Sequence, residues 1–342
     1  MTYFSGRLFA AALAPVLALT AGSALADVKL RYSQWLPASY PLQAEVIDPW
    51  FAEIARVTEG RVTVSAAPKV IGNVAGQYDV LAEGLADVAL VVPGYTPGRF
   101  PLTQGLELPF IGDNPLVSIP LSQRAYEQFL APQDVFEDIV PLLVFTGNPA
   151  HLALRGGRID SLDQITGLKL RSPQKAASEA LEMLGATPIS KPMSEVYELA
   201  SSGTIDGGII PPDTVLGFNL AGTLKDYVLI PGGIVNTVNM LAFSPEAWEK
   251  ITPADQEAIR SVSGEVLAGK LAAVYAKSLN DALAAMPAAG MTVQTLPEDV
   301  AEALRAKLAP LRSEWIEKAK AAGMAQAEEM LVFLEEGNKA AR

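Results

Sequence analysis

The first part of the chain alternates between strand-like and helix-like hydrophobic patterns. Alternating apolar residues predict strands over 28–32 and 61–65, and the apolar run 87–92 predicts a strand buried on both faces. Between these strands, apolar residues at helical spacing predict helices within 39–60 and over 78–83. The order strand–helix–strand–helix–strand indicates an α/β sheet with right-handed crossover connections.

The middle of the chain repeats this alternation. Short apolar runs predict strands at 142–145, 152–154, 168–171, 205–210 and 238–243. The first two of these runs are candidates to cross between two lobes. Three helices are predicted, each with a glycine at or just beyond its end. The first runs from Ser161 to Gly167 and the second from Gln174 to Leu184. The third is capped by Ser194, with Gly203 beyond its end.

The last hundred residues have a mostly helical pattern. Ser-Pro at 244–245 and Thr-Pro at 252–253 are typical helix starts, because a capping hydroxyl precedes a proline at the first helical position. From 253 the apolar pattern continues to Leu283, which predicts one helix long enough to lie against both lobes. Pro297 begins a further helix, and we expect Pro310 to kink it.

The N-terminus has the features of an export signal. Arg7 precedes the apolar run 8–19, and Ala-Leu-Ala at 24–26 forms a small-residue cleavage pattern. The apolar run is short for a membrane span. We therefore expect cleavage after Ala26 and a periplasmic protein that begins at Asp27. An uncleaved membrane anchor is the alternative, and no long apolar stretch follows to support it.

Composition narrows the class of protein. About three hundred residues remain after cleavage, enough for one large domain or two ordinary ones. Loss of Arg7 changes the formal net charge from −12 to −13, so nucleic acid is not an expected partner. The chain has no cysteine, which excludes disulfides, thiol catalysis and thiolate metal sites.

Two candidate catalytic or cofactor motifs do not meet the requirements of the chemistry. Residues 264–271 imitate a phosphate-binding loop, but Leu271 replaces the metal-binding hydroxyl and the segment lies within a helical pattern. His151 is the only histidine, so a serine triad or a zinc site would depend on it alone, with carboxylates. We expect no enzyme activity, no cofactor and no metal site.

Four segments in a fixed order point to a family. They read GLKLRSP at 167–173, LGATP at 184–188, SEVY at 194–197 and GTIDG at 203–207. Together with TEGRV at 58–62 and the region 94–110, they resemble the DctP-type substrate-binding proteins of TRAP transporters. The resemblance covers essentially the whole chain after residue 26.

This resemblance implies two α/β lobes, joined by crossing strands and spanned by a long helix, in a periplasmic-binding-protein fold. The expected parts are a signal peptide at 1–26, a first lobe of 27–148 plus about 236–275, and a second lobe of 149–235 plus about 276–342. The resemblance also implies hinge closure around a carboxylate-bearing ligand. The implied partner is an integral-membrane TRAP permease that an ion gradient drives, and we expect the binding protein to be a monomer.

Arg171 is the principal candidate ligand-binding residue. It lies at the carboxyl end of a predicted strand, where open α/β sheets bind ligands, and its guanidinium can hold a carboxylate by two parallel hydrogen bonds. By position alone, a surface ion pair is the alternative. The family pattern favours the ligand contact. Further candidates, each with structural hydrogen bonding or packing as the alternative, are Gln34, Trp35, Asn73, Tyr95, Asn236 and Asn239.

Departures from the family pattern suggest the kind of ligand. His151 replaces a second arginine, Met193 replaces an aromatic residue, and Ile210 replaces a polar asparagine contact. Because unpaired polar groups on a buried ligand are costly, this pocket should disfavour hydroxyl-rich sugar acids. We predict a ligand with one principal carboxylate and an apolar or aromatic body, enclosed by Trp35, Tyr95 and Met193. The alternative is that Ile210 only packs.

Two other functions are compatible with such a sequence. A periplasmic sensor subunit that presents its ligand to a membrane receptor would have the same kind of chain. An enzyme on the same scaffold is the other alternative, because a fold does not fix a function.

Overall fold

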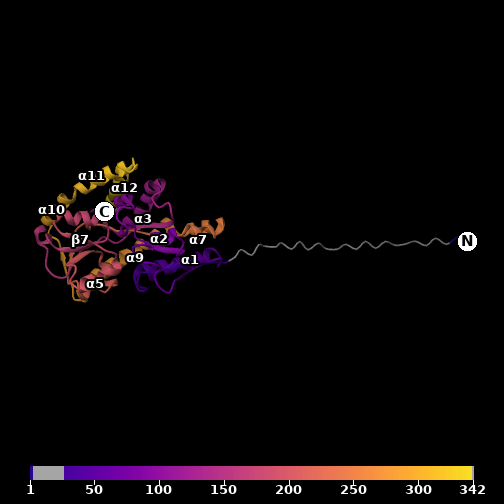
Figure 1. Cartoon of the computed structure of the whole chain (residues 1–342), viewed down its shortest axis with the longest axis horizontal. Coiled ribbons are helices and arrows are strands. Elements are labelled where there is room, and N and C mark those ends of the chain that lie inside the picture. Colours follow the sequence, from indigo (N-terminus) through magenta and orange to yellow (C-terminus); the bar gives the residue numbers. More distant parts are fainter. Residues whose placement is uncertain (3–26, 341–342) are drawn as a thin grey trace.

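The computed structural model describes residues 1–2 and 27–340. The expected export signal and its cleavage site lie outside the described residues, apart from the first two. From residue 27 the chain forms two β-sheets with helices around each, as Figure 1 shows. We call the first sheet and the helices that pack on it the first lobe, and the second sheet with its helices the second lobe.

The first sheet has five strands in the order β2-β1-β3-β10-β4. Its strands are β1 (Val28–Ser33), β2 (Val62–Ala66), β3 (Val88–Val91), β4 (Val140–Thr146) and β10 (Val238–Phe243). β1 is parallel to β2 and β3, whereas β10 is antiparallel to β3 and β4. The strands predicted at the N-terminus are confirmed, and β3 is buried along its whole length, as its continuous apolar run predicts.

The second sheet has six strands in the order β11-β9-β5-β8-β6-β7. Its strands are β5 (His151–Leu154), β6 (Lys169–Ser172), β7 (Thr187–Ser190), β8 (Gly207–Ile210), β9 (Asp226–Leu229) and β11 (Thr292–Thr295). β6 is parallel to β7 and β8, and β5 pairs antiparallel with β8 and β9. Arg171 therefore lies near the carboxyl end of a strand inside this sheet.

Two chain segments connect the lobes side by side. Residues 147–150 lead from β4 to β5, and residues 230–237 lead from β9 back to β10. The segments pair through an antiparallel bridge between Ala150 and Val235. The amide of Gly147 also donates to the carbonyl of Thr237 at 2.8 Å. This narrow pair of crossing segments is the covalent connection expected of a hinge.

Helices surround both sheets. The α-helices are α1 (Asp48–Val57), α2 (Gln77–Ala82), α3 (Pro115–Ala125), α4 (Lys175–Met183), α5 (Val196–Ser201), α6 (Pro212–Gly217), α7 (Pro245–Glu249), α8 (Pro253–Ser261), α9 (Gly264–Ala285), α10 (Glu298–Leu308), α11 (Pro310–Ala321) and α12 (Ala327–Ala340). Shorter helical turns include η1 (Leu42–Ile47), η2 (Pro93–Tyr95), η3 (Pro101–Glu107), η6 (Leu162–Ile165) and η7 (Met193–Glu195). In Figure 1, α1, α2 and α7 lie on one side and α5 and β7 on the other, with α9 between them.

The predicted long helix from residue 253 is wrong in one respect. It is two helices, α8 and α9, and the break falls at Ser263 and Gly264. Gly264 has a φ of +50°, and the Ser263 hydroxyl donates to the carbonyl of Ile259 at 2.7 Å. The apolar spacing continues across the break because residues of both helices pack on the same first-lobe core. α9 contacts both lobes, through η1, α3 and β4 in the first and α6 in the second.

The predicted cap at Ser194 is also wrong. This residue lies inside the turn η7, and α5 begins at Val196 without a side-chain cap. By contrast, Ser161, Ser244 and Thr252 all accept a main-chain N–H at the predicted helix starts. The difference is one of position, because Ser194 is inside a helical turn whose N-cap is Pro192, whereas the other three residues are themselves N-caps.

The C-terminal helices pack against both lobes. α10 and α11 contact α4 in the second lobe, and α12 packs on α3 in the first. A Cβ at Gly337 of α12 would approach the side chain of Leu121 to 2.7 Å, so this glycine allows close helix packing. The sequence predicted that residues 276–342 belong to the second lobe, and that prediction did not include the contact of α12 with α3 in the first lobe. Within the described residues no helix combines the length and the apolar character that a membrane crossing requires.

Candidate functional site: a cavity between the lobes

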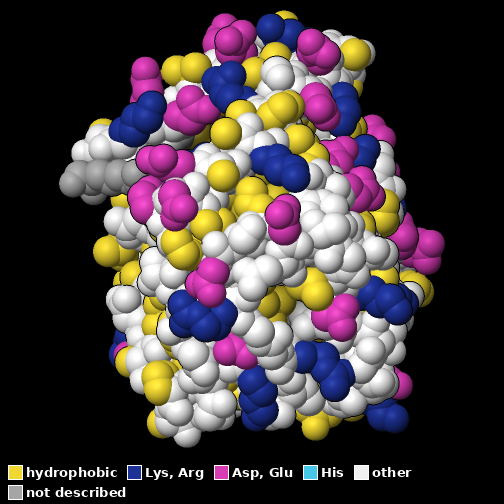
Figure 2. Space-filling view, turned by 90° about the vertical axis from the view of Figure 1, so that its left-hand side faces the viewer, with side chains coloured by type: hydrophobic (Ala, Val, Ile, Leu, Met, Phe, Trp, Pro, Cys, Tyr) yellow, Lys and Arg dark blue, Asp and Glu magenta, His cyan; other side chains and the backbone are white. Residues whose placement is uncertain are grey.

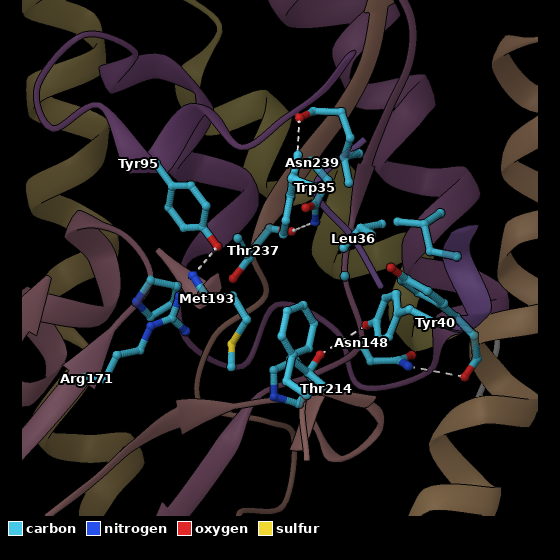
Figure 3. Close-up of a pocket in the computed structure, with 17 residues that line it drawn as sticks. Trp35, Leu36, Tyr40, Tyr95, Asn148, Arg171, Met193, Thr214, Thr237 and Asn239 are labelled. Atoms are coloured by element: carbon cyan, nitrogen blue, oxygen red, sulfur yellow. Dashed lines mark hydrogen bonds between the residues drawn. The ribbon is translucent and has the colours of Figure 1, made fainter. Parts of the chain in front are cut away.

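A cavity lies between the two lobes and is lined by residues from both, as Figure 3 shows. Its volume, counted as the space open to water-sized molecules, is about 70 Å³. A space of this size holds several waters, and hence a small compact molecule. Its lining includes Trp35, Tyr40, Tyr95, Asn148, Arg171, Met193, Thr214, Phe218, Asn239 and Tyr275.

Arg171 carries a buried positive charge into this cavity. Its side chain is 2% exposed. Nε donates to the carbonyl of Lys191 at 2.9 Å, and Nη1 donates to the carbonyl of Ile209 at 3.3 Å. The Tyr95 hydroxyl is a further side-chain hydrogen-bond partner of the guanidinium. Burial lowers the pKa of Arg171, while the adjacent Tyr95 hydroxyl opposes that shift.

Among the described residues, no carboxylate pairs with the charge of Arg171. Arg171 takes part in none of the ion pairs formed within residues 27–340. Neutral carbonyls orient a guanidinium but do not neutralise it, and an uncompensated buried charge is costly. An arginine remains protonated even when buried. An anion in the cavity would therefore compensate the charge of Arg171.

The walls next to Arg171 are apolar and come from both lobes. The Tyr95 hydroxyl accepts the main-chain N–H of Met193 at 3.1 Å, which links η2 of the first lobe to η7 of the second. The indole of Trp35 is held by a hydrogen bond from Nε1 to the carbonyl of Leu90 at 2.9 Å. With Met193 and Phe218, these rings offer a surface suited to an apolar or aromatic group.

A buried polar network lies at the other end of the cavity. Tyr40 of the first lobe donates its hydroxyl to Asp213 Oδ2 at 2.7 Å and lies 3.1 Å from Thr214 Oγ1. Burial raises the pKa of Asp213, while hydrogen bonds from Asn148 and Tyr40 oppose that shift. Figure 3 shows Arg171 on one side and Tyr40, Asn148 and Thr214 on the other, with Met193 between them. The cavity thus has a cationic end and an uncharged polar end backed by a carboxyl group.

Comparison with known proteins identifies the family. Residues 32–319 match the bacterial extracellular solute-binding proteins of family 7, or DctP family. The chain belongs to this family. It is 28% identical over 266 residues to the outer membrane transporter protein TsaT of Comamonas testosteroni, which is 78% of each chain. The resemblance seen in the sequence is confirmed.

Solved structures share the fold of this DctP-family protein. A TRAP periplasmic solute-binding protein of Bordetella bronchiseptica, with bound (R)- and (S)-mandelate, matches with a TM-score of 0.87 and 28% identity. The match covers 92% of this chain and 100% of that chain. A TRAP solute-binding protein of Rhodoferax ferrireducens matches over the same shares, with a TM-score of 0.84 and 23% identity. The two-lobed fold predicted from the sequence is confirmed.

The structure brings five of the ten predicted ligand-binding residues of this DctP-family protein together. Trp35, Tyr95, Arg171, Met193 and Asn239 all line the cavity. They come from segments spread over two hundred residues of sequence, which the two sheets and the crossing segments place around one space. That these five residues bind a ligand stays a prediction.

The other five predicted residues lie outside the lining. The Gln34 amide donates to the carbonyl of Leu36 at 3.3 Å, and the Asn73 side chain accepts the N–H of Gly76 at 2.8 Å. Asn236 donates to the carbonyl of Gly112 at 2.9 Å. Each of these three side chains satisfies the main chain close to it. That is the structural alternative that the sequence left open.

His151 and Ile210 are core residues of the second sheet. Nδ1 of His151 accepts the N–H of Ile230 at 3.1 Å, and burial lowers the pKa of this histidine to about 4. The side chain is therefore neutral near pH 7. Ile210 is fully buried and pairs with His151 across β5 and β8. Within the described residues no cluster of three or more His, Cys, Asp or Glu could hold a metal ion.

The lining residues that sequence reasoning missed include Tyr40, Asn148, Thr214, Phe218 and Tyr275. Tyr40 and Phe218 pack edge to face with ring centroids 5.7 Å apart, although 178 positions separate them. Only Asn148 had a usable signal, because it follows a predicted strand that could cross between the lobes. The others come together only through the packing of one lobe on the other.

Gly94 allows the lobes to approach each other beside the cavity. A Cβ at this position would overlap the Cβ of Gln174, which precedes α4 in the second lobe. We expect Gly94→Ala to hold the lobes apart and to weaken ligand binding about 10-fold, since overpacking costs about 1–3 kcal/mol. Titration calorimetry measures the effect. Gly222→Ala is the matched control, because a Cβ there meets open space. Equal affinity of both variants would show that the contact does not limit closure.

Proposed function

We propose that this protein captures a monocarboxylate with an apolar or aromatic body between its lobes and delivers it to TRAP permease subunits in the membrane. The observation that carries the proposal is the buried guanidinium of Arg171, which faces the cavity without a carboxylate partner. A ligand carboxylate would supply the missing charge and accept hydrogen bonds from the guanidinium. Away from water this contact fixes both the orientation and the class of the ligand.

The rest of the cavity supports the ligand class. Trp35, Met193 and Phe218 offer aromatic and thioether surface but no charge. Lys191, whose carbonyl accepts a hydrogen bond from Arg171, pairs through its ammonium group with Glu195 at 2.9 Å. The mandelate found in the Bordetella bronchiseptica protein is an aromatic monocarboxylate, in agreement with these walls. A second carboxylate or a polyhydroxylated chain would have few partners here.

Further parts of the proposal concern the setting of the protein. We propose that residues 1–26 are a cleaved export signal and that the mature monomer works in the periplasm without catalysing a reaction. The first lobe would comprise 27–148 and about 236–275, and the second 149–235 and most of the chain from about 276. On the face shown in Figure 2, Lys and Arg are interspersed with Asp and Glu. That mixture, with the acidic net charge, supports the absence of a nucleic-acid partner.

A thermal-shift screen of purified residues 27–342 tests the proposed ligand class. We expect aromatic monocarboxylates to raise the melting temperature, because a ligand at 100 times its dissociation constant stabilises the folded state by about 2.7 kcal/mol. Sialic and sugar acids serve as the comparison set. A larger shift from those acids would contradict the ligand class. No shift from any acid, with no retained ligand in mass spectrometry of the denatured protein, would contradict the proposed function.

A further inference from the structure

The polar end of the cavity has a defined direction of hydrogen bonding. Tyr40 has one hydroxyl hydrogen, and it goes to Asp213 Oδ2 at 2.7 Å. The contact of 3.1 Å between Tyr40 and Thr214 must then use the hydrogen of Thr214. The lone pairs of Thr214 Oγ1 remain, and Thr214 lines the cavity. Tyr40 and Asp213 thus make Thr214 a hydrogen-bond acceptor toward the ligand.

Two amides add acceptors to the lining of the cavity, Asn148 beside Tyr40 and Thr214 and Asn239 elsewhere. Asn148 donates its amide to the carbonyl of Tyr275 at 3.3 Å and to Ser278 at 3.4 Å. A carbonyl can only accept, so the amide orientation is fixed and Oδ1 is left without a partner within the described residues. The amide nitrogen of Asn239 likewise donates to the carbonyl of Thr237 at 2.9 Å. The amide oxygen of Asn239 takes no part in that bond. Both asparagines line the cavity.

From this arrangement we infer that the ligand is a hydroxylated aromatic acid, whose hydroxyl donates to Thr214 Oγ1 at the end of the cavity opposite Arg171. The inference rests on the proposed function, because Arg171 must hold the carboxylate for the hydroxyl to reach the other end. A wall of acceptors favours a group that carries a hydrogen and disfavours an ether oxygen of similar position. Buried acceptors also disfavour a ligand that leaves them unpaired.

The test compares the binding of a parent acid, its hydroxylated derivative and the matching methyl ether to the wild-type protein. The probes are phenylacetate and benzoate, their meta- and para-hydroxy derivatives and the matching methoxy derivatives, measured by titration calorimetry. We expect at least one hydroxylated acid to bind about 10-fold more tightly than both its parent and its methyl ether. If the parents bind and no hydroxyl improves affinity, this inference is overturned while the proposed function stands. If no acid in the series binds, this inference is overturned, and the proposed function also fails when no other monocarboxylate shifts the melting temperature and no retained ligand is found.

Variants separate the acceptor from general effects on the fold. Thr214→Val keeps the shape of the side chain but removes the acceptor, so we expect the affinity ratio between the hydroxylated acid and its parent to fall from about 10-fold toward equality. Thr223→Val is the matched control, because the Thr223 hydroxyl bonds the carbonyl of Leu220 in the same lobe and does not line the cavity. A preserved hydroxyl preference in Thr214→Val would overturn the assignment of the acceptor.

Tyr40 acts as a positioning residue in this inference. Without its hydroxyl, Thr214 is free to rotate and to donate its hydrogen to the ligand. We therefore expect Tyr40→Phe to narrow the affinity ratio between the hydroxylated acid and its methyl ether from about 10-fold toward equality. A purely structural role would weaken both ligands by the same factor and leave the ratio unchanged. An unchanged ratio would overturn the orientation that Tyr40 gives to Thr214.

Discussion

Arg171→Lys is expected to weaken ligand binding by about 30- to 4,000-fold, which corresponds to the 2–5 kcal/mol lost when one member of a buried charge pair is altered. A lysine ammonium is a single point charge with three donors. It cannot reach the carbonyls of Lys191 and Ile209 and also offer two parallel donors to a carboxylate. Titration calorimetry with the best acid from the thermal-shift screen gives the dissociation constants. Arg171→Ala should lose at least as much affinity.

A matched arginine controls for general effects of the substitution. Arg155 also donates to a main-chain carbonyl, that of Ala200 at 2.9 Å, and follows a strand of the same sheet. It does not line the cavity, so Arg155→Lys should leave the dissociation constant within a factor of two or so of wild type. Chemical denaturation of each variant shows whether the fold is intact. Near-normal binding by both Arg171 variants would place the carboxylate anchor elsewhere.

Local chemistry explains which parts of the fold were predictable. Ser244 and Thr252 cap their helices because the whole signal, a hydroxyl followed by proline, lies within four residues. The break at Ser263 was not predictable from apolar spacing. The Ser263 hydroxyl there also accepts a hydrogen bond from Trp50 at 3.2 Å, a residue more than two hundred positions away. A tertiary contact of this kind does not change the spacing of apolar residues, so the sequence pattern does not reveal it.

The same distinction applies to the site. Arg171 was predictable because one strand end and one charge define its role, and the family pattern reinforced it. Tyr40 and Thr214 were not, because each has a plausible structural role within its own segment. They meet across 174 positions only after the lobes have packed together. Asn73 was a candidate from the family pattern, and its side chain closes a local turn with Gly76.

Glu107 provides the largest predicted effect on stability. This carboxyl is 1% exposed, and Oε1 accepts the N–H of Val238 at 2.9 Å, where β10 begins beside the cavity. Burial raises the pKa of Glu107 to about 8, although the hydrogen bond from Val238 opposes the shift. The folded protein therefore keeps this group protonated over a range of pH in which the unfolded chain ionises it.

The sign of the pH dependence follows from these two states. Below an unfolded pKa of 4.5 both states bind the proton, so the group does not alter stability there. Between pH 4.5 and 8 only the unfolded chain is ionised, and stability falls by about 1.4 kcal/mol for each pH unit. The total loss attributed to Glu107 is on the order of 5 kcal/mol by pH 8.

Glu107→Gln should remove this loss, because the amide is neutral and its oxygen can still accept the Val238 N–H. We expect the variant to match wild type near pH 4 and to be several kcal/mol more stable at pH 8 by chemical denaturation. Glu302→Gln, at an exposed position on α10, is the control and should show no such divergence. Parallel pH profiles for wild type and Glu107→Gln would mean that the carboxyl is already ionised in the folded protein. The Val238 contact would then hold a charge at the start of the strand that carries Asn239 into the site.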